Sequence, residues 1–160
     1  MSIVQHEIPD ARVLDLFAGT GALGLEALSR GAAFCDFVDS AEVALRTVRA
    51  NVATLGAALR CDTHRADAVA FVAALTGTAY DLAFADPPYH QGFAARLAEL
   101  WLVRPFAQVF GVEHGVDEVM PAGGTLKKYA GTGVTVFRSP SPAALVSPSS
   151  HALSPTHNRS

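Results

Sequence analysis

Short apolar runs that each lead to a carboxylate constrain the fold of this chain more than any other feature. Three runs, at 12–17, 34–39 and 80–86, have the length and residue types of buried strands. A fourth run at 106–113 has a similar composition. Segments of helical period separate the runs, and this alternation is typical of parallel strands joined by right-handed crossover helices. The pattern therefore predicts a doubly wound, mostly parallel α/β sheet.

The segment 41–55 has the clearest helical pattern between these runs. Its apolar residues recur at spacings of three and four up to Leu55, Ser40 is suited to be the N-cap, and Gly56 is suited to end the helix. Weaker patterns predict further helices at 22–30, 68–76 and about 91–100.

The C-terminal part of the chain departs from the strand and helix alternation. Residues 126–129 and 134–137 flank the segment Gly131-Thr-Gly133, and this arrangement predicts a terminal antiparallel hairpin. Residues 139–160 are rich in Ser and Pro and contain no acidic residue. We therefore expect one domain over 1–138, followed by a disordered tail.

Composition limits the classes of function. The chain has 12 Lys and Arg against 15 Asp and Glu, a net charge of −3, which disfavours a protein that holds nucleic acid chiefly through phosphates. Cys35 and Cys61 lie in apolar segments without CxxC spacing, so we expect two core thiols and neither a disulfide nor a zinc site. The six histidines lack metal-ligand spacing. Without a membrane-length apolar stretch or a signal pattern, the sequence predicts a cytoplasmic protein with no membrane partner.

Acidic residues stand at or near the ends of the predicted strands. They are Asp15, Asp39, Asp67, Asp86 and Glu113, separated each time by about one strand-plus-helix unit. The carboxyl ends of parallel strands meet at one edge of the sheet, where open α/β folds bind ligands. Any one of these acids alone could equally be a loop residue or an N-cap. Five in phase favour a binding edge.

A glycine-rich turn follows the first strand. Gly19, Gly21 and Gly24 form a GxGxxG pattern between a strand and a helix, which first suggests NAD or FAD. Asp39 could accept hydrogen bonds from ribose hydroxyls. Asp15, four residues before the turn, would repel a pyrophosphate but suits a ligand that carries an ammonium and a sulfonium group. S-adenosylmethionine is such a ligand.

The segment Asp86-Pro87-Pro88-Tyr89 directly follows the apolar run Leu82-Ala83-Phe84-Ala85. Two prolines stop the strand and fix an extended loop, and the simplest interpretation is an Asp-Pro turn. For methyl transfer to an exocyclic amine of a nucleobase, Asp86 and the Pro87 carbonyl could accept the two N–H hydrogens. Tyr89 could stack on a base that has been unstacked from its strand.

With these motifs the sequence resembles class I S-adenosylmethionine-dependent methyltransferases, and more closely the small bacterial family that methylates guanine N2 in small-subunit ribosomal RNA. The resemblance covers roughly residues 10–138, and it rests on 13–31, on 86–89 and more loosely on Lys127-Lys128-Tyr129. It implies a Rossmann-like sheet. The candidate cofactor-binding residues are Asp15, Phe17, Gly19, Thr20, Gly21, Asp39, Asp67 and Ala68. The candidate catalytic residues are Asp86, Pro87, Pro88 and Tyr89.

The resemblance implies transfer of a methyl group from S-adenosylmethionine to a nucleobase amine, with small-subunit ribosomal RNA or an assembly particle as partner. Adenine N6 and a protein glutamine amide remain alternative acceptors. A non-catalytic S-adenosylmethionine-binding module is an alternative function, and so is an NAD-linked oxidoreductase, which Asp15 disfavours. Family members carry a longer, basic segment before the first strand, whereas eleven residues precede Arg12 here. We therefore expect a cofactor pocket that lacks one wall. Either the start of the sequence is truncated, or activity on RNA is weak, altered or dependent on a partner.

Overall fold

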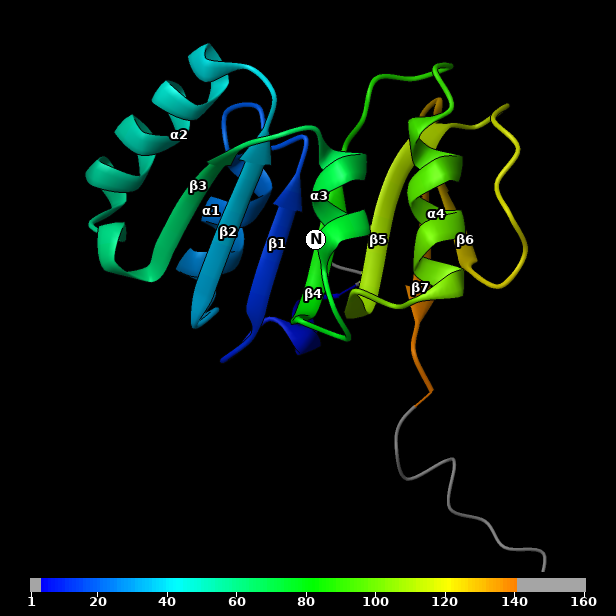
Figure 1. Ribbon diagram of the computed structural model, residues 1–160, viewed down its shortest axis with the longest axis horizontal. Helices are drawn as coiled ribbons and strands as arrows, with labels where there is room; N and C mark the ends of the chain where they lie inside the picture. Colours follow the sequence, from blue (N-terminus) through cyan, green and yellow to red (C-terminus); the bar gives the residue numbers. More distant parts are fainter. Residues whose placement is uncertain (1–3, 141–160) are drawn as a thin grey trace, which may run out of the picture.

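A computed structural model of the protein describes residues 4–140 (Figure 1). The strands are β1 (Arg12–Leu16), β2 (Phe34–Asp39), β3 (Cys61–Arg65), β4 (Tyr80–Ala85), β5 (Ala107–Gly115), β6 (Thr125–Tyr129) and β7 (Thr132–Arg138). Within this part of the chain they form one sheet in the order β3-β2-β1-β4-β5-β7-β6. Strands β1 to β5 pair in parallel, and β7 pairs antiparallel with β5 and β6. The predicted mostly parallel sheet and its terminal hairpin are confirmed.

Helices cover both faces of the sheet. They are α1 (Ala22–Ser29), α2 (Glu42–Leu55), α3 (Ala68–Ala74) and α4 (Phe93–Val103), with short 3-10 turns η1 (Gln5–Glu7) and η2 (Ala58–Arg60). Helices α3 and α4 lie together on one face (Figure 1). Helices α1 and α2 pack on the opposite face. Each face therefore has its own apolar core, as a doubly wound fold requires.

Buried apolar side chains fill both layers. Phe37 and Val48 are fully buried between the sheet and the α1/α2 side. On the α3/α4 side Trp101 packs against Phe137, and its indole N–H donates to the Ala107 carbonyl at 2.8 Å. Trp101 therefore belongs to the core, and its one polar group is satisfied.

The start of α2 differs from the prediction. Ser40 is not the N-cap, because the helix begins one residue later, with Ala41 at that position. The Ala41 N–H instead donates to the Asp39 carboxylate at 2.9 Å. The strand-end acid therefore holds the N-cap residue, and no side chain caps the helix. Gly56 ends the helix as predicted, with a left-handed φ of 70°.

Three further boundaries or environments differ from expectation. Helix α4 begins at Phe93 rather than near residue 91, because Gly92 adopts φ 79° just before it. Gly133 lies within β7 rather than in the hairpin turn, and a Cβ there would lie 2.9 Å from the His114 ring. Cys35 is fully buried, but Cys61 is only partly buried, because it begins the edge strand β3.

The predicted tail lies mostly outside the described residues, which end at 140. Ser139, the first residue assigned to it, donates its backbone N–H to the Gln108 carbonyl of β5 at 2.8 Å. In residues 4–140 no helix combines the length and apolar character that a membrane crossing needs.

Candidate functional site

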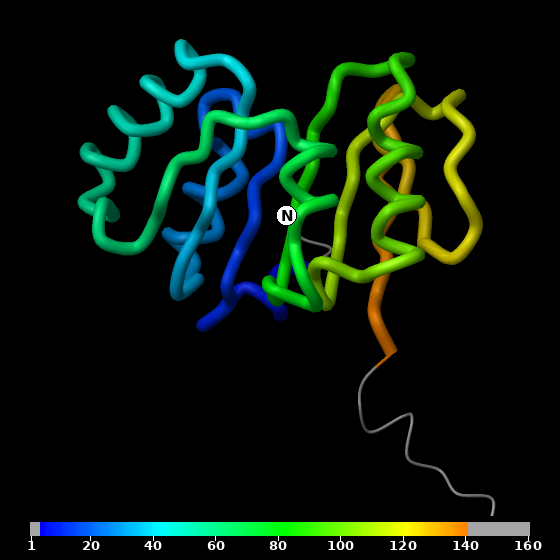
Figure 2. Tube along the Cα trace, viewed as in Figure 1, coloured from blue at the N-terminus to red at the C-terminus, as the bar shows by residue number. Residues whose placement is uncertain are grey.

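The chain reverses direction along the sheet between β1 and β4. It runs outward from β1 through β2 to β3, then returns to the other side of β1 and continues from β4 to β5 (Figure 2). Leu16 of β1 pairs with Ala85 of β4 at this point. The glycine-rich turn and the Asp86 segment therefore leave adjacent strands at the same edge. Such a switch point is where open α/β sheets bind ligands.

A cavity of about 570 Å³ lies at these carboxyl ends. Its lining is Phe17, Asp39, Ser40, Asp67, Asp86, Pro87, Pro88, Tyr89 and Phe93. The structure thus brings together two predicted cofactor carboxylates and all four predicted catalytic residues. Of the lining residues, Ser40 and Phe93 were not predicted as site residues. The Phe93 ring packs against Phe17, with ring centroids 5.3 Å apart.

The glycine-rich turn has a backbone that other residues adopt with difficulty. Phe17 has φ 55°, a left-handed conformation that is rare and strained for a bulky residue. Gly21 has φ 82° and is the N-cap of α1. A Cβ on Gly24 would lie 2.4 Å from Phe37 Cε1 and 2.7 Å from Cys35 Sγ. The turn therefore needs glycine at 21 for conformation and at 24 for the close packing of α1 on β2.

Asp15 lies beneath this turn rather than on the cavity surface. It is 1% exposed, and its Oδ2 accepts the Gly24 N–H at 3.0 Å. Burial raises the pKa of Asp15 to about 7, the Gly24 hydrogen bond opposes this, and the charges of Asp86 and Asp39 add to it. The residue fixes the start of α1, and its predicted contact with a ligand ammonium group stays a prediction.

Asp39 and Asp67 lie on the cavity surface, and their carboxylates also accept hydrogen bonds from backbone N–H groups of other residues. Asp39 accepts the Gly19 N–H at 3.0 Å through Oδ2, and the Ala41 N–H through Oδ1. Each of its oxygens retains a second lone pair that a ligand hydroxyl could use. Asp67 was expected to end a strand, but β3 ends at Arg65. Asp67 is instead the N-cap of α3 and accepts the Ala70 N–H at 2.8 Å.

Besides Asp15, four of the predicted cofactor residues do not line this cavity: Gly19, Thr20, Gly21 and Ala68. Ala68 is buried in the core beneath α3. Thr20 is exposed on the turn, and its carbonyl accepts a hydrogen bond from the Asn51 amide at 3.0 Å.

Tyr89 is held by the neighbouring strands. Its hydroxyl donates to Glu113 Oε1 of β5 at 2.5 Å and lies 3.0 Å from Thr132 Oγ1 of β7. The Glu113 bond raises the pKa of Tyr89, and Thr132 opposes this. Burial, followed by the charge of Glu113, raises the pKa of Asp86. Glu113 appeared in the sequence as a strand-end acid, but its contact with Tyr89 could not be foreseen.

Glu118 fixes the loop that follows Tyr89. Its Oε1 accepts the His90 N–H at 2.9 Å, and its Oε2 accepts the Gly115 N–H at 2.5 Å. One carboxylate therefore connects the backbone after Tyr89 to the end of β5. His90 has φ 60°, so this loop is also strained. No sequence pattern pointed to Glu118, because its partners are set by the sheet.

The histidines have other partners. His114 is buried, and its ring nitrogens lie 2.9 Å from the Gly115 carbonyl and 2.8 Å from Thr135 Oγ1. His64 lies 2.7 Å from the buried Asp36 carboxylate. Among the residues that the structure describes, no three His, Cys, Asp or Glu side chains are grouped as a metal site requires.

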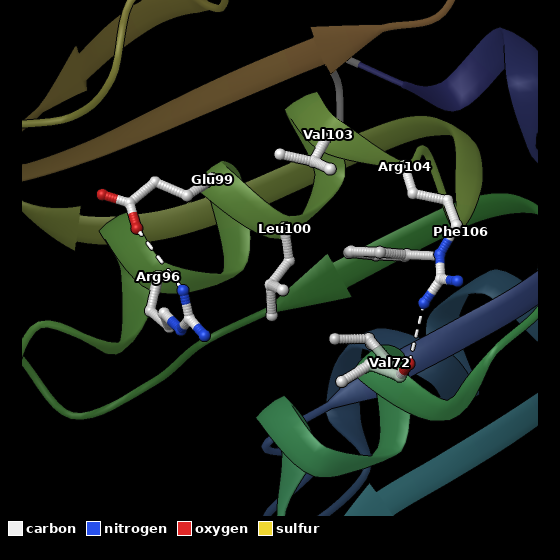
Figure 3. Close-up of a pocket in the computed structure, with 8 residues that line it drawn as sticks. Val72, Arg96, Glu99, Leu100, Val103, Arg104 and Phe106 are labelled. Carbon is white, nitrogen blue, oxygen red and sulfur yellow. Dashed lines mark hydrogen bonds and ion pairs between the residues drawn. The ribbon is translucent and has the colours of Figure 1, made fainter.

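A second cavity, of about 500 Å³, lies between α3 and α4 (Figure 3). Its polar side chains already have partners: Arg96 pairs with Glu99 at 3.9 Å, and Arg104 donates to the Ala73 carbonyl at 2.8 Å. Phe106, which precedes β5, also lines it, so this cavity lies toward the amino ends of the strands. It contains none of the predicted site residues.

Comparison with known sequences places the chain in a family. A family described as Conserved hypothetical protein 95 matches residues 1–122. Ribosomal RNA small subunit methyltransferase D of Escherichia coli strain K12 is 34% identical over 139 residues, which cover 82% of this chain and 68% of that protein. YlbH of Bacillus subtilis is 45% identical over 82 residues, or 50% of this chain. The chain spans about half the length of some relatives: 45% of YlbH and 48% of the Buchnera aphidicola methyltransferase D.

Solved structures agree with this placement. A conserved hypothetical protein from Streptococcus pyogenes has a TM-score of 0.72 and 28% identity, with 82% of this chain and 88% of that chain covered. A SAM-dependent methyltransferase from Agrobacterium tumefaciens, at 16% identity and a TM-score of 0.67, covers 86% of this chain and 60% of its own, and shares the fold. The chain therefore belongs to the Conserved hypothetical protein 95 family, the family of Ribosomal RNA small subunit methyltransferase D.

Proposed function

We propose that this protein is an S-adenosylmethionine-dependent methyltransferase that modifies ribosomal RNA, with the exocyclic N2 amine of a guanine in small-subunit RNA as acceptor. One observation carries the proposal. A single cavity at the switch point is lined by Asp39 and Asp67 on one side and by the segment from Asp86 to Tyr89 on the other. A methyl donor and an amine acceptor need such adjacent sites. The names of the relatives support ribosomal RNA as the substrate.

The residues present fit S-adenosylmethionine, which is the cofactor. The free lone pairs of Asp39 suit ribose hydroxyls, and the space beside Gly19 is open, because a Cβ there would meet nothing within 4 Å. Three carboxylates on the cavity surface, Asp39, Asp67 and Asp86, favour a cationic ligand and would repel a pyrophosphate. When bound, S-adenosylmethionine supplies a methyl group on a positively charged sulfur.

The acceptor side supplies orientation. Asp86 and the Pro87 carbonyl accept the two N–H hydrogens of the amine, so that its lone pair faces the donor. The raised pKa of Asp86 also suits it to take the proton that the amine loses. Tyr89 is 37% exposed, and its hydroxyl is fixed by Glu113 and Thr132, so the ring has a set direction in which to stack on a base. Positioning of this kind provides much of the rate.

A methyl-transfer assay tests the proposal. The chain is incubated with radiolabelled S-adenosylmethionine and either free small-subunit RNA or small-subunit particles, and the labelled nucleoside is identified after digestion. We expect label in N2-methylguanosine, and about 100-fold less or lower still with Asp86→Ala. Label in N6-methyladenosine would change the acceptor, and label in protein would contradict the RNA assignment. Cofactor binding without any transfer would favour a non-catalytic binding module.

A further inference from the structure

The only two lysines of the chain are adjacent in β6. Lys127 and Lys128 stand in the edge strand of the sheet, all of whose residues are exposed. Tyr129 follows them with 46% of its surface exposed. The strand therefore presents two cations and an aromatic ring to solvent.

The register of the sheet places this strand beside the acceptor loop. Tyr129 pairs directly with Thr132 of β7, and the Thr132 hydroxyl lies 3.0 Å from the Tyr89 hydroxyl. Directly paired residues share a face, and neighbouring strands lie about 4.8 Å apart. Tyr129 is thus one strand away from the residue that contacts Tyr89.

Lys127 continues the same surface. It pairs with Val134 of β7, and Val134 pairs with Glu113 of β5, the residue that accepts the Tyr89 hydroxyl. Lys127 therefore lies two strands, or about 10 Å, outward from Glu113 along one row of the sheet. Lys128 alternates to the opposite face of β6, and because β6 is an exposed edge strand the two lysines flank its open edge.

Charge makes this strand distinct from its surroundings. Glu113, Asp117 and Glu118 give the rim of the acceptor loop a negative charge that repels phosphates. Most arginines already pair with carboxylates or bind carbonyl oxygens: Arg12, Arg30, Arg49, Arg60, Arg96, Arg104 and Arg138. Beside the acceptor loop, the described residues offer Lys127 and Lys128 as cations without such a partner; Arg46 and Arg65 lie on α2 and β3.

We propose that Lys127, Lys128 and Tyr129 form the docking surface for the single-stranded RNA next to the acceptor base. The lysines bind phosphates, and Tyr129 stacks on a base that neighbours the one in the cavity. This surface would give a chain of net charge −3 a local RNA contact where the reaction needs it. The inference rests on the proposed RNA methyltransferase function.

Fluorescence anisotropy with a short, fluorescein-labelled single-stranded RNA of mixed sequence measures the contact. We expect Lys127→Glu with Lys128→Glu to weaken binding at least tenfold and to reduce the salt slope by about 1.4, or about 0.7 for each phosphate contact. Tyr129→Ala should weaken binding about fivefold or more through lost stacking. The matched control for the single variant Lys127→Glu is Arg46→Glu, which makes the same charge change on the exposed face of α2. The control should change affinity less than twofold.

Acetylation of lysines gives an independent readout on the unaltered protein. Because the chain has no other lysine, an amine-reactive reagent reports on this surface and on the terminal amine alone. We expect the RNA to protect both lysines. Lysines on an edge strand can also serve only to prevent pairing between molecules. In that case the double variant would self-associate in gel filtration while RNA affinity and labelling stayed unchanged, and the inference would be wrong.

Cofactor titration separates this inference from the proposed function. All the variants should bind S-adenosylhomocysteine as the unaltered chain does, because β6 does not line the cavity. If the chain binds cofactor and methylates RNA but the lysine variants bind RNA normally, only the docking surface is refuted. If no cofactor binds, the proposed function fails, and protection of the lysines still decides the docking surface. An unaltered chain that binds no RNA refutes it.

Discussion

The two sides of the cavity are built differently. On the cofactor side, two of these three carboxylate contacts are local: Asp39 reaches Ala41 across two residues and Asp67 reaches Ala70 across three, while Asp39 also reaches Gly19 across 20 residues. On the acceptor side, the loop is held from distant strands, and the contacts of Tyr89 span 24 and 43 residues. The cofactor side thus combines local contacts with the pairing of β1 and β2, whereas the acceptor side exists only once β5 and β7 are in place. Substitutions on the cofactor side should therefore change cofactor affinity, and substitutions on the acceptor side should change methyl transfer.

Loss of the acceptor-side carboxylate should have the largest effect. Asp86→Ala removes the group that orients the amine, and we expect methyl transfer to fall by about 100-fold or more, because an interaction used in the transition state appears in turnover. Cofactor affinity, measured by calorimetry, should stay within about threefold, or about 0.7 kcal/mol. A parallel loss of cofactor affinity would show that the two sides are not separable.

Gly24→Ala tests the rigid packing of the cofactor side. The new methyl group would lie within 3 Å of the Phe37 ring and the Cys35 sulfur, so we expect the free energy of unfolding to fall by about 1–3 kcal/mol, together with weaker cofactor binding. Gly111→Ala is the matched control, because the nearest atom to its Cβ is Phe84 Cδ1 at an ordinary 3.8 Å. Chemical denaturation measures both variants, and equal losses of stability would refute this account of the turn.

Asp39→Ala should weaken binding of S-adenosylhomocysteine by about 1–3 kcal/mol, the usual cost of losing hydrogen bonds to a charged acceptor. Folding should change little, since other contacts hold β2 in the sheet. Asp62→Ala, which removes an exposed carboxylate on β3, should leave the affinity unchanged. If Asp39→Ala instead unfolds the protein while the folded fraction binds cofactor normally, Asp39 serves only as a structural cap.

Glu118→Gln sharpens the comparison with a smaller effect. The amide keeps one acceptor oxygen but turns an N–H donor toward the His90 or Gly115 N–H, so the loop after Tyr89 loses one anchor. We expect turnover to fall about tenfold with unchanged cofactor affinity. Chemical shifts of the His90 and Gly115 amide protons should move upfield in the variant. Normal turnover with shifted amides would mean that the anchor does not position the acceptor loop.

This division also explains what the sequence could predict. The strand and helix alternation and the strand-end acids are local patterns, and they located Asp39, Asp67 and Asp86 around one cavity. The Ser40 cap was wrong because the helix begins one residue later, with Ala41 as its N-cap, and Asp39 accepts the Ala41 N–H from the strand end. The partners of Tyr89 and His90 could not be predicted, because they depend on how β5 and β7 pair across the sheet.

Calorimetric titration of the unaltered chain with S-adenosylhomocysteine, S-adenosylmethionine and NAD tests most directly whether the switch-point cavity is a cofactor site of this chemistry. The account predicts saturable binding of both S-adenosyl compounds and no measurable heat with NAD, because the carboxylates of the cavity favour a cationic ligand over a pyrophosphate. Asp39→Ala should weaken that binding, and Asp86→Ala should not. Saturable binding of NAD, with no response to either S-adenosyl compound, would contradict the account.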